Sequence, residues 1–437
     1  VGIRYDKEQG TVGPFTQPNF TWYEPGSPRR GEVVYGDVVT ALDIKEYKAP
    51  ASWSLFSPRV SFTYDITGDG KNVVKLSAGR YMSQSGNTIA GNYVPYRYGF
   101  ADWTDANGDE IPQFYELGDM FWDDLFVQVD PVTGMNRVMY DSDYNTPYLD
   151  ELTLMFEKAL TDDLALSLTG FYKKKHNLSN DVDSRGEVAN VSKGYWLDGT
   201  VEGKDNWTQI DDTSVGGTNV PTYEQINTPD GVYYYNLEKA YDRYLGVQFA
   251  MTKKLSHKWM ANLSFTLQDW KRFRFEDETL NMNNFNFFNE APVAPATTGS
   301  GLRDIWINSR WMVKLTGMYQ LPGGINLTGF FQAREGNPQP LRRRISLNQG
   351  GQYLYQNGKK VGDDRLPTFW MLNLGLEKTL KISDTVTATL VVDWYNATNN
   401  QIELKHNLGI GADAPGDVQP TMWSNAGVFQ FGVRVNF

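Results

Sequence analysis

The strongest constraint in this 437-residue chain is a period-two alternation of apolar and polar residues in segments of about ten residues. In the final segment Phe429, Phe431, Val433, Val435 and Phe437 alternate with Gln430, Gly432, Arg434 and Asn436. Because successive side chains of a strand point to opposite faces, one face of this segment is wholly apolar. About ten residues is the length that a tilted strand needs to cross a bilayer, whereas strands of soluble proteins average about five or six.

The same alternation recurs along the chain. Further apolar faces are formed by Val60, Phe62 and Tyr64, by Leu164, Leu166 and Leu168, by Trp259, Ala261, Leu263, Phe265 and Leu267, by Ile325, Leu327 and Phe331, and by Trp370, Leu372, Leu374 and Leu376. No stretch approaches the roughly 18 uninterrupted apolar residues of a spanning helix. If the chain crosses a membrane, strands must do so.

Short and long connections alternate between these segments. The short turns lie at 67–71, 161–163, 254–257, 321–324 and 382–384, and the long loops cover 7–55, 83–148, 176–240, 271–303, 336–365 and 398–426. Transmembrane barrels have short periplasmic turns and long extracellular loops, whereas a soluble fold has no reason to sort its loops by end. The sequence therefore predicts an all-β, antiparallel transmembrane barrel with about twelve strands, located in the bacterial outer membrane.

Aromatic residues are frequent near the ends of the segments, where a membrane barrel has its interfacial girdles. The candidates are Tyr172, Trp259, Trp270, Trp306, Trp311, Tyr319, Trp370 and Trp394. Some of them are expected to pack inside the loops instead.

Composition excludes several other classes of function. The chain has no cysteine, so disulfides, thiolate metal sites and cysteine nucleophiles are absent. Its net charge of -11 disfavours nucleic acid as a partner. The three histidines, His176, His257 and His406, are not spaced as a metal pair or beside a nucleophile. We therefore expect no enzyme activity and no required cofactor.

Several short motifs, in this order, are more specific than any of them alone. They are GIRYD at 2–6, SPRV at 57–60, GRY at 79–81, LPGGINLTG at 321–329, RLP at 365–367, LEK at 376–378, DWYN at 393–396 followed by Asn399, and FGVRVNF at 431–437. Together they resemble the C-terminal barrel portion of TonB-dependent outer-membrane receptors, especially the large Oar-like branch. The resemblance covers nearly the whole chain.

This resemblance implies features that the sequence does not contain. Such receptors have an N-terminal plug, a segment that contacts the TonB complex, and about ten further strands of a barrel of about 22. We therefore expect residues 1–437 to be the C-terminal part of a larger barrel; the alternative is a complete twelve-stranded barrel. The resemblance also implies that the barrel-assembly machinery reads the terminal strand, Phe429, Phe431, Val433, Val435 and Phe437, with Phe437 as its last residue.

One loop has the spacing of a calcium site. Asp105, Asn107, Asp109 and Glu116 occupy positions 1, 3, 5 and 12 of an EF-hand-like loop, which would surround a hard cation with oxygen atoms. Position 6 is Glu110 instead of glycine, and an Asn-Gly turn in an acidic loop has much the same sequence without a metal. Both interpretations stay open at this point.

A basic cluster, Arg342, Arg343 and Arg344, lies in or near a predicted extracellular loop. Guanidinium groups there could bind an anionic ligand or the phosphates of lipopolysaccharide through bidentate contacts, or they could be solvated loop charges.

The function expected from these observations is a receptor or transporter that takes up a large extracellular ligand with TonB-derived energy. Two alternatives remain: a porin-like or adhesive outer-membrane barrel without energy coupling, and a soluble extracellular β-rich binding module. The identity of the ligand is open among iron chelates, cobalamin, glycans and peptides.

Overall fold

The fold is described from a computed structural model of the chain. The residues that the structure describes are 1–17, 22–24, 31–33, 42–44, 46–82, 98–100, 102–109, 116, 121–123, 138–140, 145–178, 207–215, 218–225, 232–234, 236, 240–273, 291–292, 308–338, 342–347, 350–355, 362, 364–406, 409–410 and 420–437.

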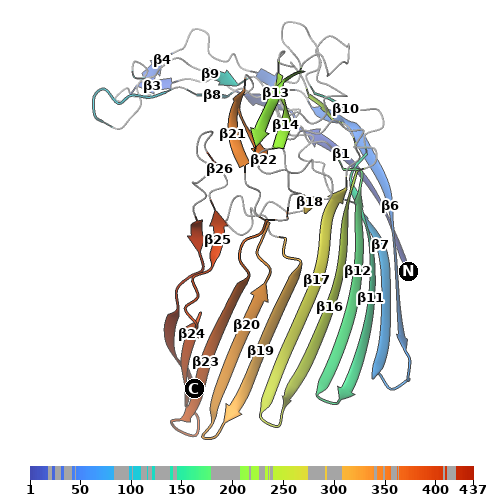
Figure 1. Ribbon diagram of the computed structural model, residues 1–437, viewed down its shortest axis with the longest axis vertical. Helices are drawn as coiled ribbons and strands as arrows, with labels where there is room; N and C mark the ends of the chain where they lie inside the picture. Colours follow the sequence, from blue (N-terminus) through green and yellow to red (C-terminus); the bar gives the residue numbers. More distant parts are fainter. Residues whose placement is uncertain are drawn as a thin grey trace.

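One large antiparallel sheet dominates the molecule (Figure 1). Its main path runs through β1 (Gly2–Val12), β6 (Tyr47–Asp65), β7 (Asn72–Met82), β11 (Tyr148–Thr161), β12 (Leu164–His176), β16 (Tyr241–Ser256), β17 (Trp259–Phe273), β19 (Trp311–Leu321), β20 (Ile325–Arg334), β23 (Phe369–Lys381), β24 (Thr387–Tyr395) and β28 (Val428–Asn436). The long strands that pair with each other also follow one another along the chain, so the sheet is an antiparallel meander. The prediction of about twelve barrel strands is confirmed.

Shorter strands lie in the segments that the sequence assigns to long loops. They are β2 (Phe15–Gln17), β3 (Trp22–Glu24), β4 (Gly31–Val33), β5 (Leu42–Ile44), β8 (Tyr98–Phe100), β9 (Phe121–Asp123), β10 (Val138–Tyr140), β13 (Trp207–Val215), β14 (Thr218–Gln225), β15 (Val232–Tyr234), β18 (Ala291–Pro292), β21 (Arg342–Leu347), β22 (Gly350–Tyr355), β25 (Glu403–His406), β26 (Gly409–Ile410) and β27 (Pro420–Trp423). Most pair with each other in small separate sheets, and β18 pairs with β17.

Five short turns join the paired strands at one end of the sheet, the lower end in Figure 1. In the turn between β6 and β7, Asp65 accepts hydrogen bonds from the backbone amides of Thr67 (3.3 Å) and Gly70 (2.6 Å). Gly68 and Gly70 have φ angles of 73° and 74°, a left-handed conformation that glycine adopts without steric cost. Local turn chemistry therefore fixes this hairpin and, with it, the register of its strands.

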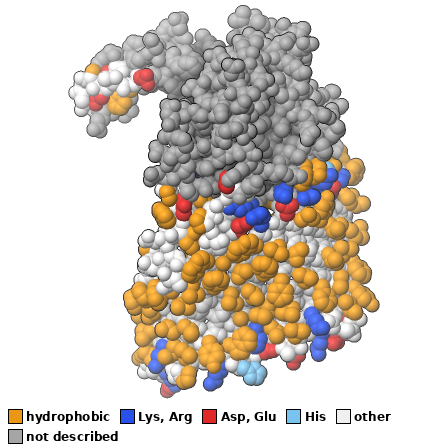
Figure 2. Space-filling view, viewed as in Figure 1, with side chains coloured by type: hydrophobic (Ala, Val, Ile, Leu, Met, Phe, Trp, Pro, Cys, Tyr) orange, Lys and Arg blue, Asp and Glu red, His pale blue; other side chains and the backbone are white. Residues whose placement is uncertain are grey.

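The two faces of the sheet differ in chemistry. Large hydrophobic side chains are exposed on one side of every strand of the main path; we call this side the apolar face and the other side the polar face. Figure 2 shows the apolar face as a continuous band that is bounded above by acidic and basic side chains. Buried apolar side chains in the described residues are few: Trp53, Leu178, Ala240, Ala261, Leu366 and Phe369. The pattern is that of a sheet whose hydrophobic surface faces lipid instead of a protein core.

Three strands extend into segments that the sequence assigns to long loops. Residues 7–12 and 47–55, expected as loop, continue β1 and β6, with a register shift between Gln9 and Thr11. Lys7, Glu8 and Gln9 are polar on both faces, so the alternation disappears there although backbone pairing continues. A similar extension carries β17 to Phe273, beyond the predicted loop boundary at residue 271.

The sheet has two open edges, one at each of its outermost strands. Among the described strands, β1 pairs only with β6 and β28 pairs only with β24. Each therefore has one edge with no described strand beside its backbone amides and carbonyls.

None of the described residues forms a helix that is both long and apolar enough to span a membrane.

Candidate ligand site on the polar face

A pocket of about 540 Å³ opens on the polar face, near the ends of β11, β12, β16 and β17 that lie away from the short turns. It is lined by Leu149, Phe171, Lys173, Lys175, Asp242, Tyr244, Gln248, Thr266 and Trp270. Along their strands, all nine residues alternate with the apolar-face residues, such as Leu152, Leu245 and Leu267. Their side chains therefore lie on the polar face. The pocket is thus formed jointly by four strands and depends on how they are paired.

The strand register brings distant residues into rows across the pocket. One row contains Glu151, Lys173, Tyr244 and Trp270, and the next row towards the loop end contains Leu149, Lys175, Asp242 and Arg272. Directly opposed side chains in a sheet lie within about 5.5 Å of each other. The two rows therefore bring lysine, carboxylate and aromatic groups together from segments about 100 residues apart in the chain.

Ion pairs order the charged side chains of this surface. Lys173 Nζ lies 2.7 Å from Glu151, and Arg272 binds the carboxylate of Asp242 with two hydrogen bonds of 2.6 and 2.8 Å. The Asp242 residue is buried, which makes this pair the rigid side of the pocket. Lys175 and the side-chain amide of Gln248 also line the cavity.

The aromatic wall depends on a glycine. Tyr244 and Trp270 meet edge to face, with ring centroids 6.1 Å apart. The Tyr244 ring lies over Gly246, where an added Cβ would come within 2.7 Å of the ring. Any larger residue at position 246 would displace Tyr244 from the wall.

A second polar cluster holds the same ends of β19, β20 and β23 together. Arg365 donates to the backbone carbonyls of Asn308 (2.5 Å) and Gly336 (3.2 Å), and its guanidinium lies 3.2 Å from Glu335. Burial raises the pKa of Glu335, but hydrogen bonds from Arg310 and the charge of Arg365 outweigh it, so the net pKa is below its ordinary value. The RLP motif at 365–367 thus contributes a structural arginine.

The predicted calcium loop is folded around Glu116. This buried carboxylate accepts hydrogen bonds from the backbone amides of Ala106 (2.9 Å) and Asn107 (3.3 Å) and from the indole of Trp103 (3.1 Å). Asp105 accepts from the amide of Gly108 (2.6 Å), and Asn107 Nδ2 donates to Asp109 (3.0 Å).

Protein donors thus already occupy several of the oxygens that a cation would need. Within the described part of the chain, no group of three or more His, Cys, Asp or Glu side chains is arranged to hold a metal. Calcium binding at Asp105, Asn107, Asp109 and Glu116 stays a prediction.

The other predicted residues are not among the described residues that line the pocket. Arg342, Arg343 and Arg344 belong to β21, whose backbone pairs with β22 and β26; their side chains lie outside the described residues. The terminal residues Phe429, Phe431, Val433 and Val435 project from the apolar face of β28, and Phe437 follows it. Their proposed recognition by the assembly machinery is a prediction that the fold leaves open.

The family model of the outer membrane beta barrel domain matches residues 1–338. The chain belongs to this family. The predicted membership of an outer-membrane barrel class and the predicted location in the outer membrane are therefore confirmed. In this barrel the apolar face contacts lipid, the polar face lines the lumen, and the short turns lie on the periplasmic side. The pocket accordingly opens at the extracellular end of the lumen.

Solved structures of outer-membrane transporters and receptors are similar to this chain at low identity. The outer membrane transporter YddB from Escherichia coli is 12% identical with a TM-score of 0.45, and the match covers 90% of this barrel and 42% of YddB. The ferric-catecholate import receptor Fiu from E. coli K12 is 11% identical, with a TM-score of 0.43 and coverage of 95% and 39%. The FrpB iron transporter from Neisseria meningitidis is 8% identical, with a TM-score of 0.44 and coverage of 88% and 38%.

The barrel therefore spans about two fifths of the length of these structures. No curated protein matches the sequence closely enough to count as a relative.

Sequence reasoning missed the pocket and misplaced one of its residues. Trp270 is expected in the lipid-facing girdle because it lies near a strand end, but it lines the lumenal pocket. Trp270 is an odd number of residues away from Leu263 and Leu267 in the same strand. Because successive side chains alternate between the faces, the sequence already places Trp270 on the polar face. The remaining girdle candidates in β12, β17, β19, β23 and β24 have the parity of the apolar face, while Trp306 lies outside the described residues.

Proposed function

We propose that this barrel is the ligand-binding part of an outer-membrane receptor that takes up a large extracellular ligand with energy from the TonB complex. The observation that carries the proposal is the lumenal pocket at the extracellular end, with an aromatic wall and two lysines. A site in that position meets a ligand before it enters the lumen. The chemistry is binding followed by passage, with no covalent step, and a ligand-induced shift between conformations would couple the two.

The pocket favours a ligand that combines flat apolar and anionic parts. Tyr244, Trp270 and Phe171 offer ring faces and edges, and Lys173 and Lys175 offer ammonium groups. Gln248 and Thr266 add hydrogen-bonding groups on the lower side. Among the four open classes, chelates with aromatic and acidic groups fit this combination best, since glycans and cobalamin use the cations less.

Replacing Trp270 by alanine is expected to weaken ligand binding about 30-fold, because a central aromatic anchor typically contributes about 2 kcal/mol or more. Isothermal titration of the full-length protein against a panel of ferric chelates, cobalamin, oligosaccharides and peptides would measure this loss. Trp370→Ala is the matched control, since Trp370 is a partly exposed tryptophan of the lipid-facing side. Equal affinities in the two variants would argue against the lumenal pocket as the ligand site.

Energy coupling separates active uptake from the porin-like and adhesive alternatives. Uptake of the bound panel member by intact cells should stop when a protonophore collapses the proton-motive force, while binding to the cells persists. Uptake that continues under the protonophore would indicate a passive pore, and binding without uptake would indicate an adhesin.

We also propose that further strands of the same polypeptide close the sheet at β1 and β28. Backbone groups that lack partners cost several kcal/mol each in the hydrocarbon region, so a spanning sheet with open edges is not viable in lipid. The intact mass of the native protein from outer membranes is expected near 100 kDa, as for a barrel of about 22 strands with a plug. A mass near the 49.6 kDa of these 437 residues would instead require β1 and β28 to pair with each other.

A further inference from the structure

A belt of charged residues crosses the apolar face at its extracellular boundary. The register places Arg80, Asp150, Lys174, Arg243 and Lys271 in a single row across β7, β11, β12, β16 and β17. All five have the parity of the lipid-facing side, the same as Leu76, Leu152, Tyr172, Leu245 and Leu267. These charges therefore project towards the membrane and not into the lumen.

The belt contains more cations than carboxylates. Arg80 is held by Asp150 through hydrogen bonds of 2.7 and 2.8 Å. A single carboxylate, Asp269, lies 3.1 Å from Arg243 and 3.2 Å from Lys271. The four cations of the row and these two carboxylates give a formal charge of +2, in a chain whose net charge is -11. Among the described residues, this surplus of positive charge lies where the barrel meets the outer leaflet.

Aromatic rings on the extracellular side hold the cations in place. Arg80 lies over the ring of Tyr148 at 4.2 Å, Lys174 over Tyr241 at 4.2 Å, and Arg243 over Phe273 at 4.6 Å. Cation–π contacts of this kind favour a fixed position of the charged group. The belt is thus a preorganised row of donors and not a set of mobile surface charges.

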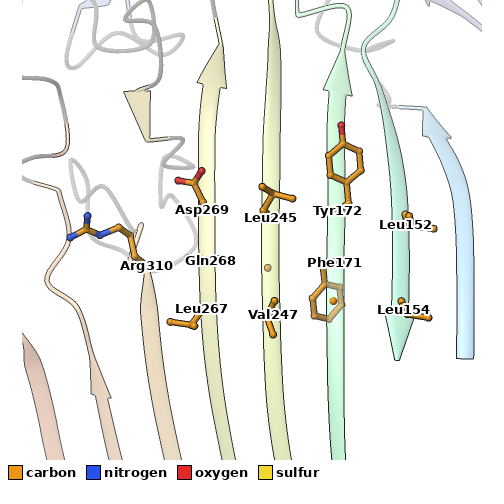
Figure 3. A pocket seen from close by; sticks show the side chains of 12 residues that line it. Leu152, Leu154, Phe171, Tyr172, Leu245, Val247, Leu267, Gln268, Asp269 and Arg310 are labelled. Atoms are coloured by element: carbon orange, nitrogen blue, oxygen red, sulfur yellow. The ribbon is translucent and has the colours of Figure 1, made fainter. Parts of the chain in front are cut away.

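Figure 3 shows a hollow in the apolar surface of β11, β12, β16 and β17. The strand register places this hollow directly below the belt. One row of paired residues across the hollow consists of Leu154, Gly170, Val247 and Leu267. Gly170 has no side chain to fill the centre of this row. This hollow, or groove, has a volume of about 690 Å³. Its upper row is formed by Leu152, Tyr172, Leu245 and Asp269. An added Cβ at Gly170 would meet only the Leu154 carbonyl, at 4.0 Å, so the space beside it is open.

We propose that this belt and groove form a binding site for one phosphorylated outer-leaflet lipid, with its phosphate on Lys174, Arg243 and Lys271 and one acyl chain in the hollow at Gly170. A lipid has both parts at the required spacing, an anionic headgroup directly above an apolar chain. Guanidinium and ammonium groups are the usual partners of phosphate oxygens. This proposal places lipopolysaccharide-type phosphates on strand residues of the barrel wall, and anion binding by Arg342, Arg343 and Arg344 stays a separate prediction.

The charge arm of the test removes two cations of the belt. Native mass spectrometry of the full-length protein would count bound lipid A diphosphate against phosphatidylcholine in a neutral detergent. The double variant Lys174→Gln, Lys271→Gln is expected to bind lipid A about 30-fold more weakly, since each cation near an anionic headgroup contributes about 1 kcal/mol. The double variant Lys158→Gln, Lys314→Gln removes the same charge elsewhere on the barrel and should bind as the unaltered protein does.

The groove arm fills the hollow without changing charge. Gly170→Leu is expected to reduce lipid A binding, whereas Gly329→Leu, on the apolar face of β20, should leave it unchanged. Inorganic phosphate at millimolar concentration should not displace the lipid, because the acyl chain provides part of the affinity.

Three results would overturn the proposal. They are equal retention of lipid A and phosphatidylcholine, unchanged retention in the Lys174, Lys271 variant, and full displacement by inorganic phosphate, which would leave a simple anion site. None of these outcomes depends on the ligand or on energy coupling, so this site and the proposed receptor function are tested separately.

Discussion

Replacing Asn396 by alanine is expected to lower the free energy of unfolding by about 4 kcal/mol. The buried Asn396 side chain donates to the carbonyls of Asn400 (3.0 Å) and Asn425 (2.7 Å) and accepts from the amide of Asn400 (3.1 Å). Each of these groups loses its partner in the variant, at about 1 kcal/mol apiece. The φ angle of 45° adds about 1 kcal/mol of strain for alanine.

The measurement is urea unfolding of the purified protein in phospholipid micelles, followed by tryptophan fluorescence. Asn396→Gly separates the two contributions, since glycine relieves the backbone strain and should recover only about 1 kcal/mol. Asn262→Ala, an exposed asparagine on the lumenal side of β17, serves as the control and should change stability by less than about 0.5 kcal/mol. A loss below 1 kcal/mol in Asn396→Ala would show that the turn does not hold β24 to β28.

Replacing Gly336 by alanine is expected to cost about 3 kcal/mol, at the upper end of what overpacking typically costs. An added Cβ would overlap the backbone carbonyl of Leu366 and lie 2.7 Å from the carbonyl oxygen of Pro367. The neighbouring atoms are backbone, so no side chain can rotate away, and the segment after β20 must separate from the segment before β23. That separation would also break the hydrogen bond from Arg365 to the Gly336 carbonyl.

Thermal loss of β-sheet circular dichroism is a suitable readout, with Gly329→Ala as the matched variant. A Cβ at Gly329 meets only the Leu374 side chain, at 3.9 Å, which is ordinary van der Waals contact. The Gly336 variant should unfold at a clearly lower temperature than the Gly329 variant. Equal transition temperatures would mean that the two segments approach each other less closely than the structure indicates.

The barrel itself could be predicted because its strands carry two independent signals. Alternation identifies the lipid-facing side of each strand, and turns such as 67–71 and 321–324 fix which strands pair. Both signals are local, so one sequence suffices to obtain strand count, orientation and membrane location. Where local polarity no longer alternates, as at Lys7, Glu8 and Gln9, the prediction ended the strand too early.

The lumenal pocket is not a local property, and the sequence alone did not reveal it. Lys173 and Trp270 become members of one row only after the registers of β12, β16 and β17 are known to the residue. A shift of one residue in either pairing would move the Trp270 side chain to the lipid. The same registers assemble the charged belt from Arg80 to Lys271, which no single segment of the sequence suggests.

The meander order of the sheet also determines how the chain can fold. Each hairpin with a short turn, such as β16 and β17 across residues 257 and 258, closes a minimal loop. Pairing β7 with β11, or β12 with β16, requires closure across residues 83–147 or 177–240. Each of these loops is roughly 32 times as long as a two-residue turn, which is about five doublings of loop length. Since each doubling costs about 0.6 kcal/mol of chain entropy, closing such a loop costs about 3 kcal/mol more. Hairpins are consequently expected to form first and to associate afterwards, so that the periplasmic end of the barrel becomes ordered before the extracellular end, where both binding surfaces lie.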